Sequence, residues 1–206
     1  VVHFWGDGAG TYAPPGHWND IACEDFVKQR WSEVRWARNL ALLNASMFTA
    51  AVCCWDAKYY YYNPRPVQMN PECKTLTGLP NFPAFTSGHS TFSGAAAKFL
   101  SHVVPDQASR YMSMADEASK SRLWGGIHYR SDIEVGMAMG IAIGGKAIER
   151  AKQIHPDLII LDIMMPKKTG VEVCQILRSQ PLFQDTLIIF LTALSDEASQ
   201  IKGLET

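Results

Sequence analysis

The chain has 206 residues, a formal net charge of −1 and an apolar fraction of 47%, enough for one well-formed core or for one domain and part of another. Its lysines and arginines are spread along the sequence, without the basic patch typical of nucleic-acid-binding proteins, so we expect no nucleic-acid partner. The five cysteines form no C-x-x-C pair and no zinc-type spacing. We expect reduced thiols, which are compatible with the cytoplasm.

Targeting and membrane signals give little guidance on localisation. The first residues, VVHFWGDG, lack a basic segment followed by an apolar one, so no signal peptide is visible and the compartment stays open. The long uncharged run at 40–55 is interrupted by Asn44, Ser46 and Thr49. It is shorter than the roughly 20 apolar residues that a membrane span needs. We therefore predict a buried helix and no membrane span.

Up to about residue 150 the pattern predicts helices and no strands. A proline pair precedes the first helix, and an N-P-R-P sequence at 63–66 stops the second. A proline-rich loop follows at 63–87. The predicted helices cover residues 14–30, 32–62, 93–104, 106–121 and 131–152.

After about residue 152 the pattern changes to alternating strands and helices. Residues 156–162 and 185–193 are short continuous apolar runs, typical of buried parallel strands. Residues 169–181 are helical, and Ser195 caps a further helical start. We therefore predict a mainly α domain at 1–150 and a partial α/β segment with a parallel sheet at 151–206.

The segment GGIHYRSD, residues 125–132, places a histidine and an aspartate four positions apart. If a helix begins near His128, that residue and Asp132 share a face and can hydrogen-bond. The carboxylate would then fix the imidazole tautomer and raise its basicity. Taken alone, such a pair is more often a helix start with polar side chains on its solvated face.

Three separate segments carry groups suited to a tetrahedral oxyanion. Such an anion is held by guanidinium groups, by ammonium groups and by the amides at a helix N-terminus. The Ser87–Gly88 backbone and the Ser87 hydroxyl would supply neutral donors, and three basic residues the charge. These basic residues are Lys58, Arg65 and Arg122.

Together, these segments resemble a known three-part motif. The patterns K-x6-R-P at 58–66, S-G-H at 87–89 and S-R-x5-H-x3-D at 121–132 are similar to those shared by vanadium-dependent haloperoxidases and type 2 phosphatidic acid phosphatases. The resemblance covers roughly residues 5–150 and implies a helical bundle, here with fewer helices before the first motif than the family has. One departure is Thr86, where the family usually has proline.

The resemblance implies a role for each matching residue. His128 would bind vanadium or attack phosphorus as the nucleophile, and Asp132 would orient it. His89 would be the general acid–base. The oxygens of vanadate or phosphate would be held by Lys58, Arg65, Ser87, Gly88 and Arg122.

Further resemblances favour the haloperoxidase branch. The segment DGAGTYAPPGHWNDIA is similar to one in bacterial haloperoxidases, and Trp55 and Phe82 match aromatic positions near the vanadate in fungal chloroperoxidase-like members. The resemblance thus implies a vanadate cofactor and oxidation of halide by hydrogen peroxide. One alternative is a soluble acid phosphatase that cleaves phosphomonoesters through a phosphohistidine. Another is a non-catalytic fusion or truncated phosphorelay fragment.

Residues 153–206 resemble part of a response-regulator receiver domain. PDLIILDIMMPKKTGVEVCQILR and LIIFLTA are similar to the third strand, third helix and fourth strand of that family. The resemblance implies a partial flavodoxin-like fold, with the junction between the two parts within residues 146–155. It assigns Asp162 as phosphoacceptor and Thr192 as switch residue. The acidic pair that binds magnesium and the lysine of the fifth strand have no counterpart, so we expect this segment to be inactive. Its incomplete sheet leaves an apolar edge, and we expect self-association there.

Overall fold

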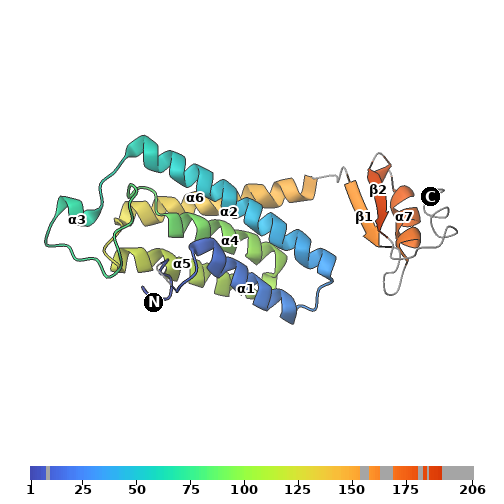
Figure 1. Ribbon diagram of the computed structural model, residues 1–206, viewed down its shortest axis with the longest axis horizontal. Helices are drawn as coiled ribbons and strands as arrows, with labels where there is room; N and C mark the ends of the chain where they lie inside the picture. The colour runs from blue at the N-terminus through green and yellow to red at the C-terminus, as the bar shows by residue number, and fades with distance from the viewer. Residues whose placement is uncertain (8–9, 154–157, 163–168, 181–182, 185, 192–206) are drawn as a thin grey trace. The chain divides into compact units, whose positions relative to one another are not determined.

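The computed structural model describes residues 1–7, 10–153, 158–162, 169–180, 183–184 and 186–191. The chain divides into two compact units, residues 1–152 and 153–206. The first unit is helical, and the second contains two strands and a helix (Figure 1). The expected fold class, a mainly helical domain followed by an α/β segment, is confirmed.

The helices of the first unit follow the predicted order with small shifts at their ends. The helix expected from residue 93 begins at Gly88, because Ser87 caps it by accepting a hydrogen bond from the Ser90 amide. The proline-rich loop contains one short helix, and a 3₁₀ turn precedes the helix expected at 106. The elements are α1 (Pro14–Lys28), α2 (Glu33–Tyr61), α3 (Pro66–Met69), α4 (Gly88–Val103), η1 (Pro105–Gln107), α5 (Ala108–Trp124) and α6 (Arg130–Gln153).

Helix α4 is the centre of the core. It packs against α1, α2 and α5, and nearly all of its side chains are buried because most of them are small. Large side chains from the surrounding helices fill the space around it. Those that are almost fully buried include Trp18, Phe26, Leu43, Met47 and Tyr111.

Helix α6 approaches α4 through a row of glycines. Gly136, Gly140 and Gly144 recur every fourth residue, so they share one face. A Cβ atom at Gly140 would lie 2.2 Å from the Thr91 carbonyl oxygen, and one at Gly144 2.7 Å from the Ala95 carbonyl oxygen. The two backbones are therefore in contact, which fixes the start of α6 against the start of α4.

Helix α2 buries only one face in the described part of the chain, so the prediction of a buried helix is wrong for its other face. Phe48 and Val52 are exposed there. The stretch Glu33–Met69 is long and apolar enough to cross a membrane, by length and composition alone. One third of its most apolar window is buried. Core helices of water-soluble proteins also meet these criteria of length and composition.

The second unit contains strands β1 (Leu158–Asp162) and β2 (Leu187–Leu191) and helix α7 (Gly170–Arg178). The strands are parallel, with Ile160 opposite Ile189. A reciprocal capping box between Thr169 and Glu172 starts α7. Asp162 is the last residue of β1. Thr192, Ser195 and the helix expected after it lie outside the described residues.

Candidate anion-binding site

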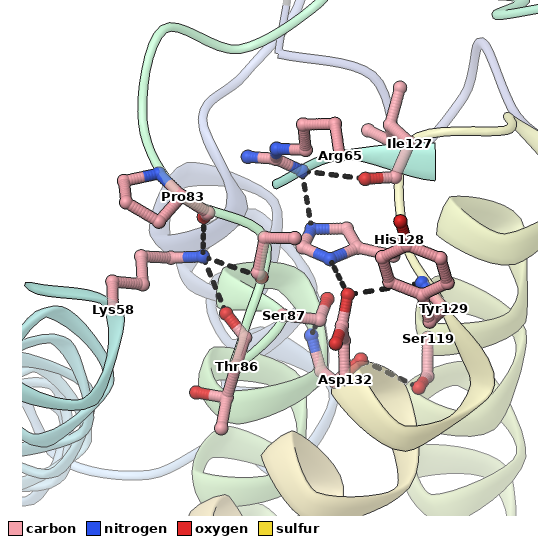
Figure 2. A network of polar contacts seen from close by, with 12 residues as sticks. Lys58, Arg65, Pro83, Thr86, Ser87, Ser119, Ile127, His128, Tyr129 and Asp132 are labelled. Atoms are coloured by element: carbon pink, nitrogen blue, oxygen red, sulfur yellow. Dashed lines mark hydrogen bonds and ion pairs between the residues drawn. The ribbon is translucent and has the colours of Figure 1, made fainter. Parts of the chain in front are cut away.

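The three sequence motifs lie where helices of the first unit begin and end. Lys58 is in the last turn of α2, Ser87 caps α4, and Arg122 is in the last turn of α5. Arg65 precedes α3, and Asp132 lies in the first turn of α6. Hydrogen bonds join most of these residues into the network that Figure 2 shows.

His128 and Asp132 form a buried pair. The His128 Nδ1 atom lies 3.0 Å from the Asp132 Oδ2 atom, which also accepts the Tyr129 amide at 3.0 Å. Helix α6 begins at Arg130, so His128 belongs to the loop before it rather than to the helix. The pair is not on a solvated face, since both side chains are almost fully buried.

Arg65, together with Asp132, determines the tautomer of His128. The Arg65 Nη1 atom lies 3.0 Å from the His128 Nε2 atom and donates to the Ile127 carbonyl at 2.7 Å. The Nε and Nη2 atoms both donate to the Phe82 carbonyl, at 3.1 and 3.0 Å. Because a guanidinium group only donates, Nε2 of His128 must accept, and the ring proton is on Nδ1, facing Asp132. The lone pair needed by a nucleophile or a metal ligand therefore points to the arginine.

Lys58 is held by backbone carbonyls in the segment before Ser87. Its ammonium group donates to the carbonyls of Pro83 (2.9 Å), Ala84 (3.0 Å) and Thr86 (Figure 2). These three bonds use all three ammonium hydrogens, so Lys58 would act on an anion through charge and by fixing this segment. Burial lowers its pKa to about 8.

The start of α4 offers a backbone donor at Gly88 rather than at Ser87. The Ser87 amide donates to the Asp132 carbonyl at 3.0 Å, and this bond ties α4 to α6. Gly88 is the first residue of α4, so its amide has no acceptor within the helix. Such an amide, at the positive end of the helix dipole, is suited to an anion.

Arg122 has one nitrogen without a partner. Its Nε atom donates to the Ser121 hydroxyl at 2.9 Å, and its Nη2 atom donates to the Val2 carbonyl at 2.8 Å. Within the described part of the chain, the buried Nη1 atom has no acceptor. Buried donors are seldom left unpaired, because this costs free energy. The orphaned nitrogen is therefore available to donate to a bound anion.

His89 is hydrogen-bonded to a residue that lies outside the three sequence motifs. Its Nε2 atom lies 2.6 Å from the Trp5 carbonyl oxygen. Burial, reinforced by the charge of Arg122, lowers the pKa of His89 to about 3. The contacts of Trp5 and Val2 span more than 80 residues of sequence, so no local pattern could have revealed them.

The site carries an excess of buried positive charge. Lys58, Arg65 and Arg122 have 0%, 1% and 1% of their surface exposed, and among the described residues Asp132 is the one acid buried beside them. Burial lowers the pKa of His128 to about 4, so the imidazole is neutral at pH 7. The exposed Asp7 also acts electrostatically on Arg65 and Arg122, so the buried cations are compensated only in part. Because buried charges need partners, the site is suited to a di- or trivalent oxyanion.

Comparison with known proteins identifies the family of the first unit. A sequence model of the PAP2 superfamily matches residues 39–152, more than half of the chain. The chain belongs to the PAP2 superfamily. This confirms the resemblance inferred from the three motifs. A model of the response regulator receiver domain matches residues 116–206; the structure places residues 116–152, common to both matches, in α5 and α6 of the first unit.

Solved structures similar to this chain include two related folds. One of them is described as the first bacterial vanadium-dependent iodoperoxidase and is 29% identical to this chain. The TM-score is 0.66, and the match covers 72% of this chain and 42% of that chain. Aquifex aeolicus LpxE has a TM-score of 0.53 over 72% of this chain and 92% of that one. LpxE is 18% identical, so it shows likeness of fold alone.

Curated relatives match the receiver part. A probable transcriptional regulator, ycf27, of Porphyridium aerugineum is 40% identical over 99 residues, 48% of this chain and 39% of the relative. The alkaline phosphatase synthesis transcriptional regulatory protein PhoP of Bacillus subtilis is 45% identical over 62 residues, 30% of this chain and 25% of the relative. The chain thus covers less than half of the length of either protein.

Proposed function

We propose that this PAP2-superfamily chain binds vanadate and oxidises halide with hydrogen peroxide. The observation that carries the proposal is the His128 Nε2 atom, an unprotonated nitrogen that lies 3.0 Å from the buried Arg65 Nη1 atom and is acted on electrostatically by the buried Lys58. The orphaned Nη1 atom of Arg122 also supports a bound oxyanion. The likeness to a vanadium-dependent iodoperoxidase, at 29% identity, favours this branch of the superfamily.

The residues present fit vanadate by charge and by donor chemistry. Arg65, Arg122 and the Gly88 amide would hold its oxygens, and Lys58 would contribute charge. The His128 Nε2 atom would be the ligand, with the Nδ1 proton held by Asp132 as a positioning residue. When bound, vanadate supplies the Lewis acid that activates hydrogen peroxide toward halide.

The overall reaction consumes one proton. One halide, one hydrogen peroxide and one proton give one hypohalous acid and one water. His89, electrostatically coupled to both Arg122 and His128, is the candidate to move this proton. In the free site, Arg65 is hydrogen-bonded to the His128 Nε2 atom. A bound anion would share or replace this hydrogen bond, so the guanidinium group is already in place beside Nε2 before the anion binds.

A phosphatase activity is the second candidate, because the same nitrogen is suited to attack on phosphorus. The His128 Nε2 lone pair would bond to the phosphorus of a phosphomonoester, and the P–O bond to the alcohol would break. A proton donated to the leaving oxygen would complete this step. Water would then hydrolyse the phosphohistidine and release phosphate.

One pair of assays separates the two candidates. The purified chain, with and without added orthovanadate, is assayed for iodide oxidation by hydrogen peroxide and for hydrolysis of p-nitrophenyl phosphate. We expect iodide oxidation that saturates with vanadate and is absent in His128→Ala. Hydrolysis that vanadate inhibits, without iodide oxidation, would instead establish the phosphatase.

A further inference from the structure

We propose that residues 2–5, which we term the N-terminal strap, position His89 and Arg122 for proton transfer and anion binding. The inference deepens the proposed function and rests on it for the chemistry. The strap lies outside all three sequence motifs. Its backbone carbonyls nevertheless accept hydrogen bonds from one side chain of the second motif and one of the third.

The strap is anchored by the Trp5 side chain. Trp5 is 1% exposed, and its indole Nε1 atom donates to the Glu117 Oε1 atom of α5 at 2.8 Å. Its ring lies against His17 and Trp18 of α1, with centroids 5.3 and 6.0 Å apart. This residue therefore fixes the strap to two helices of the bundle.

The carbonyl of Trp5 selects one tautomer of His89. A carbonyl oxygen can only accept, so the His89 Nε2 atom, 2.6 Å away, carries the proton. The Nδ1 atom then holds the lone pair, and the neutral ring can take a proton there but has none to give. When Nδ1 takes a proton, the Nε2–H bond to Trp5 becomes charge-assisted and stronger. The strap thus favours His89 as a base, much as a carboxylate orients a catalytic histidine.

The carbonyl of Val2 orients Arg122. It accepts from Nη2 while the Ser121 hydroxyl accepts from Nε, so the remaining nitrogen, Nη1, is left for an anion. The Val2 side chain reaches Gly125, where an added Cβ atom would lie 3.3 Å from Val2 Cγ1. The strap therefore has contacts at both ends that hold its carbonyls in place.

If Trp5 only stabilised the core, it would not determine which ring nitrogen of His89 carries the proton. The tautomer distinguishes the two roles. It can be read without vanadate and without activity, from long-range ¹H–¹⁵N correlation spectra of the histidine rings in the ¹⁵N-labelled full chain. His89→Gln assigns the signal by its loss. We expect the Nε2–H tautomer of His89 in the parent chain.

Variants at the anchor test the strap itself. Glu117 is exposed, so Glu117→Ala removes the acceptor of the Trp5 indole with little risk to folding. We expect mixed His89 tautomers and inorganic phosphate binding weakened by about 10–100-fold, the usual effect of losing a partner behind a ligand. Glu117→Gln, which keeps an acceptor oxygen, should restore both.

Two further substitutions control for core packing. Trp5→Phe keeps an aromatic ring at this position and loses the indole N–H, so it should reproduce Glu117→Ala. Trp36→Phe changes a tryptophan packed beside Phe26 and should leave the tautomer unchanged. An Nδ1–H tautomer in the parent chain, or no effect of Glu117→Ala and Trp5→Phe, would overturn the proposal. If iodide oxidation is absent but the His89 tautomer and phosphate binding change as expected, the proposed function is wrong and the proposed role of the strap stands.

Discussion

At the residue scale, burial determines the charge of the site histidines. The sequence predicts that Asp132 raises the basicity of His128, and the hydrogen bond does act in that direction. Removal from water outweighs it, with further lowering from Arg65 and Lys58, so the pKa falls to about 4. A neutral imidazole with Nδ1–H on the carboxylate presents Nε2 without loss of a proton. Asp132 thus acts by fixing the tautomer.

The two histidines should separate by mutation. His128→Ala should abolish vanadate-dependent oxidation, because no other described side chain of the site presents an unprotonated nitrogen beside Arg65. His89→Ala should leave vanadate affinity largely unchanged and slow turnover by about 10²–10⁴-fold, the usual contribution of a general acid–base. Vanadate titrations of the rate give both quantities. Equal losses of vanadate affinity in the two variants would contradict this division of roles.

The lowered histidine pKa values make stability depend on pH. The pKa values of His128 and His89 fall from 6.5 to about 4 and about 3 in the folded chain. Between these values and 6.5 the unfolded chain binds more protons, so the free energy of unfolding should decrease as pH falls from 6.5 toward 4. Urea unfolding at pH 5 and pH 7 measures the difference. His128→Gln should reduce it, whereas His102→Gln, at an exposed position, should not.

At the element scale, close contact between α4 and α6 positions the site. The Ser87 amide of one helix start bonds to the Asp132 carbonyl of the other. Farther along, the glycine row allows the backbones to touch. Any increase in this separation would move Asp132, and with it His128, away from the start of α4. The geometry of the site therefore depends on residues remote from its chemistry.

A methyl group in this contact should be costly. Gly140→Ala would place a Cβ atom 2.2 Å from the Thr91 carbonyl oxygen and 2.9 Å from the Ala95 nitrogen. Backbone atoms cannot rotate away, so we expect a loss of about 1–3 kcal/mol in the free energy of unfolding, as for other overpacked positions. Gly145→Ala is the control, because nothing lies within 4 Å of its Cβ position. That substitution should stabilise α6 by up to about 1 kcal/mol; similar losses in both variants would argue against helix contact as the cause.

The helices and the three motifs could be predicted from sequence because their signals are local. Proline and cap positions mark the helix ends, and each motif lies within a dozen residues. Contacts set by the tertiary fold could not be predicted. The Lys58 ammonium group donates its three hydrogens to backbone carbonyls of another segment. His89 is hydrogen-bonded to the backbone carbonyl of Trp5. Backbone carbonyls carry no sequence signature, so partners of this kind appear only in the folded chain.

At the scale of the whole molecule, the second unit leaves apolar surface uncovered. Ile160, Leu187 and Ile189 are 56%, 60% and 43% exposed, although Leu161 and Cys174 are buried within the same unit. Ile160 and Ile189 are opposite each other in the register, and Leu187 lies two residues from Ile189 on the same face. Exposed apolar patches of this kind favour association.

We expect copies of the chain to associate through this face. Size-exclusion chromatography with light scattering over a range of concentrations should show masses above that of one chain. Ile189→Lys, which puts a charge on the face, should shift the distribution toward monomer. Val34→Lys changes an exposed apolar residue of α2 and serves as the matched control. A monomer at every concentration, or an equal effect of both variants, would contradict association through the second unit.

The receiver-like aspartate should be chemically inert in this chain. Phosphoryl transfer to such a residue needs a divalent cation, and that cation needs several oxygen ligands besides the acceptor. In this chain, the segment before β1 is α6 of the PAP2 unit, so the strand that would supply the acidic pair of a receiver is replaced by a helix. We therefore expect no phosphorylation of Asp162 by acetyl phosphate and magnesium, measured by intact mass. An added phosphoryl group that disappears in Asp162→Asn would show that the incomplete receiver still reacts.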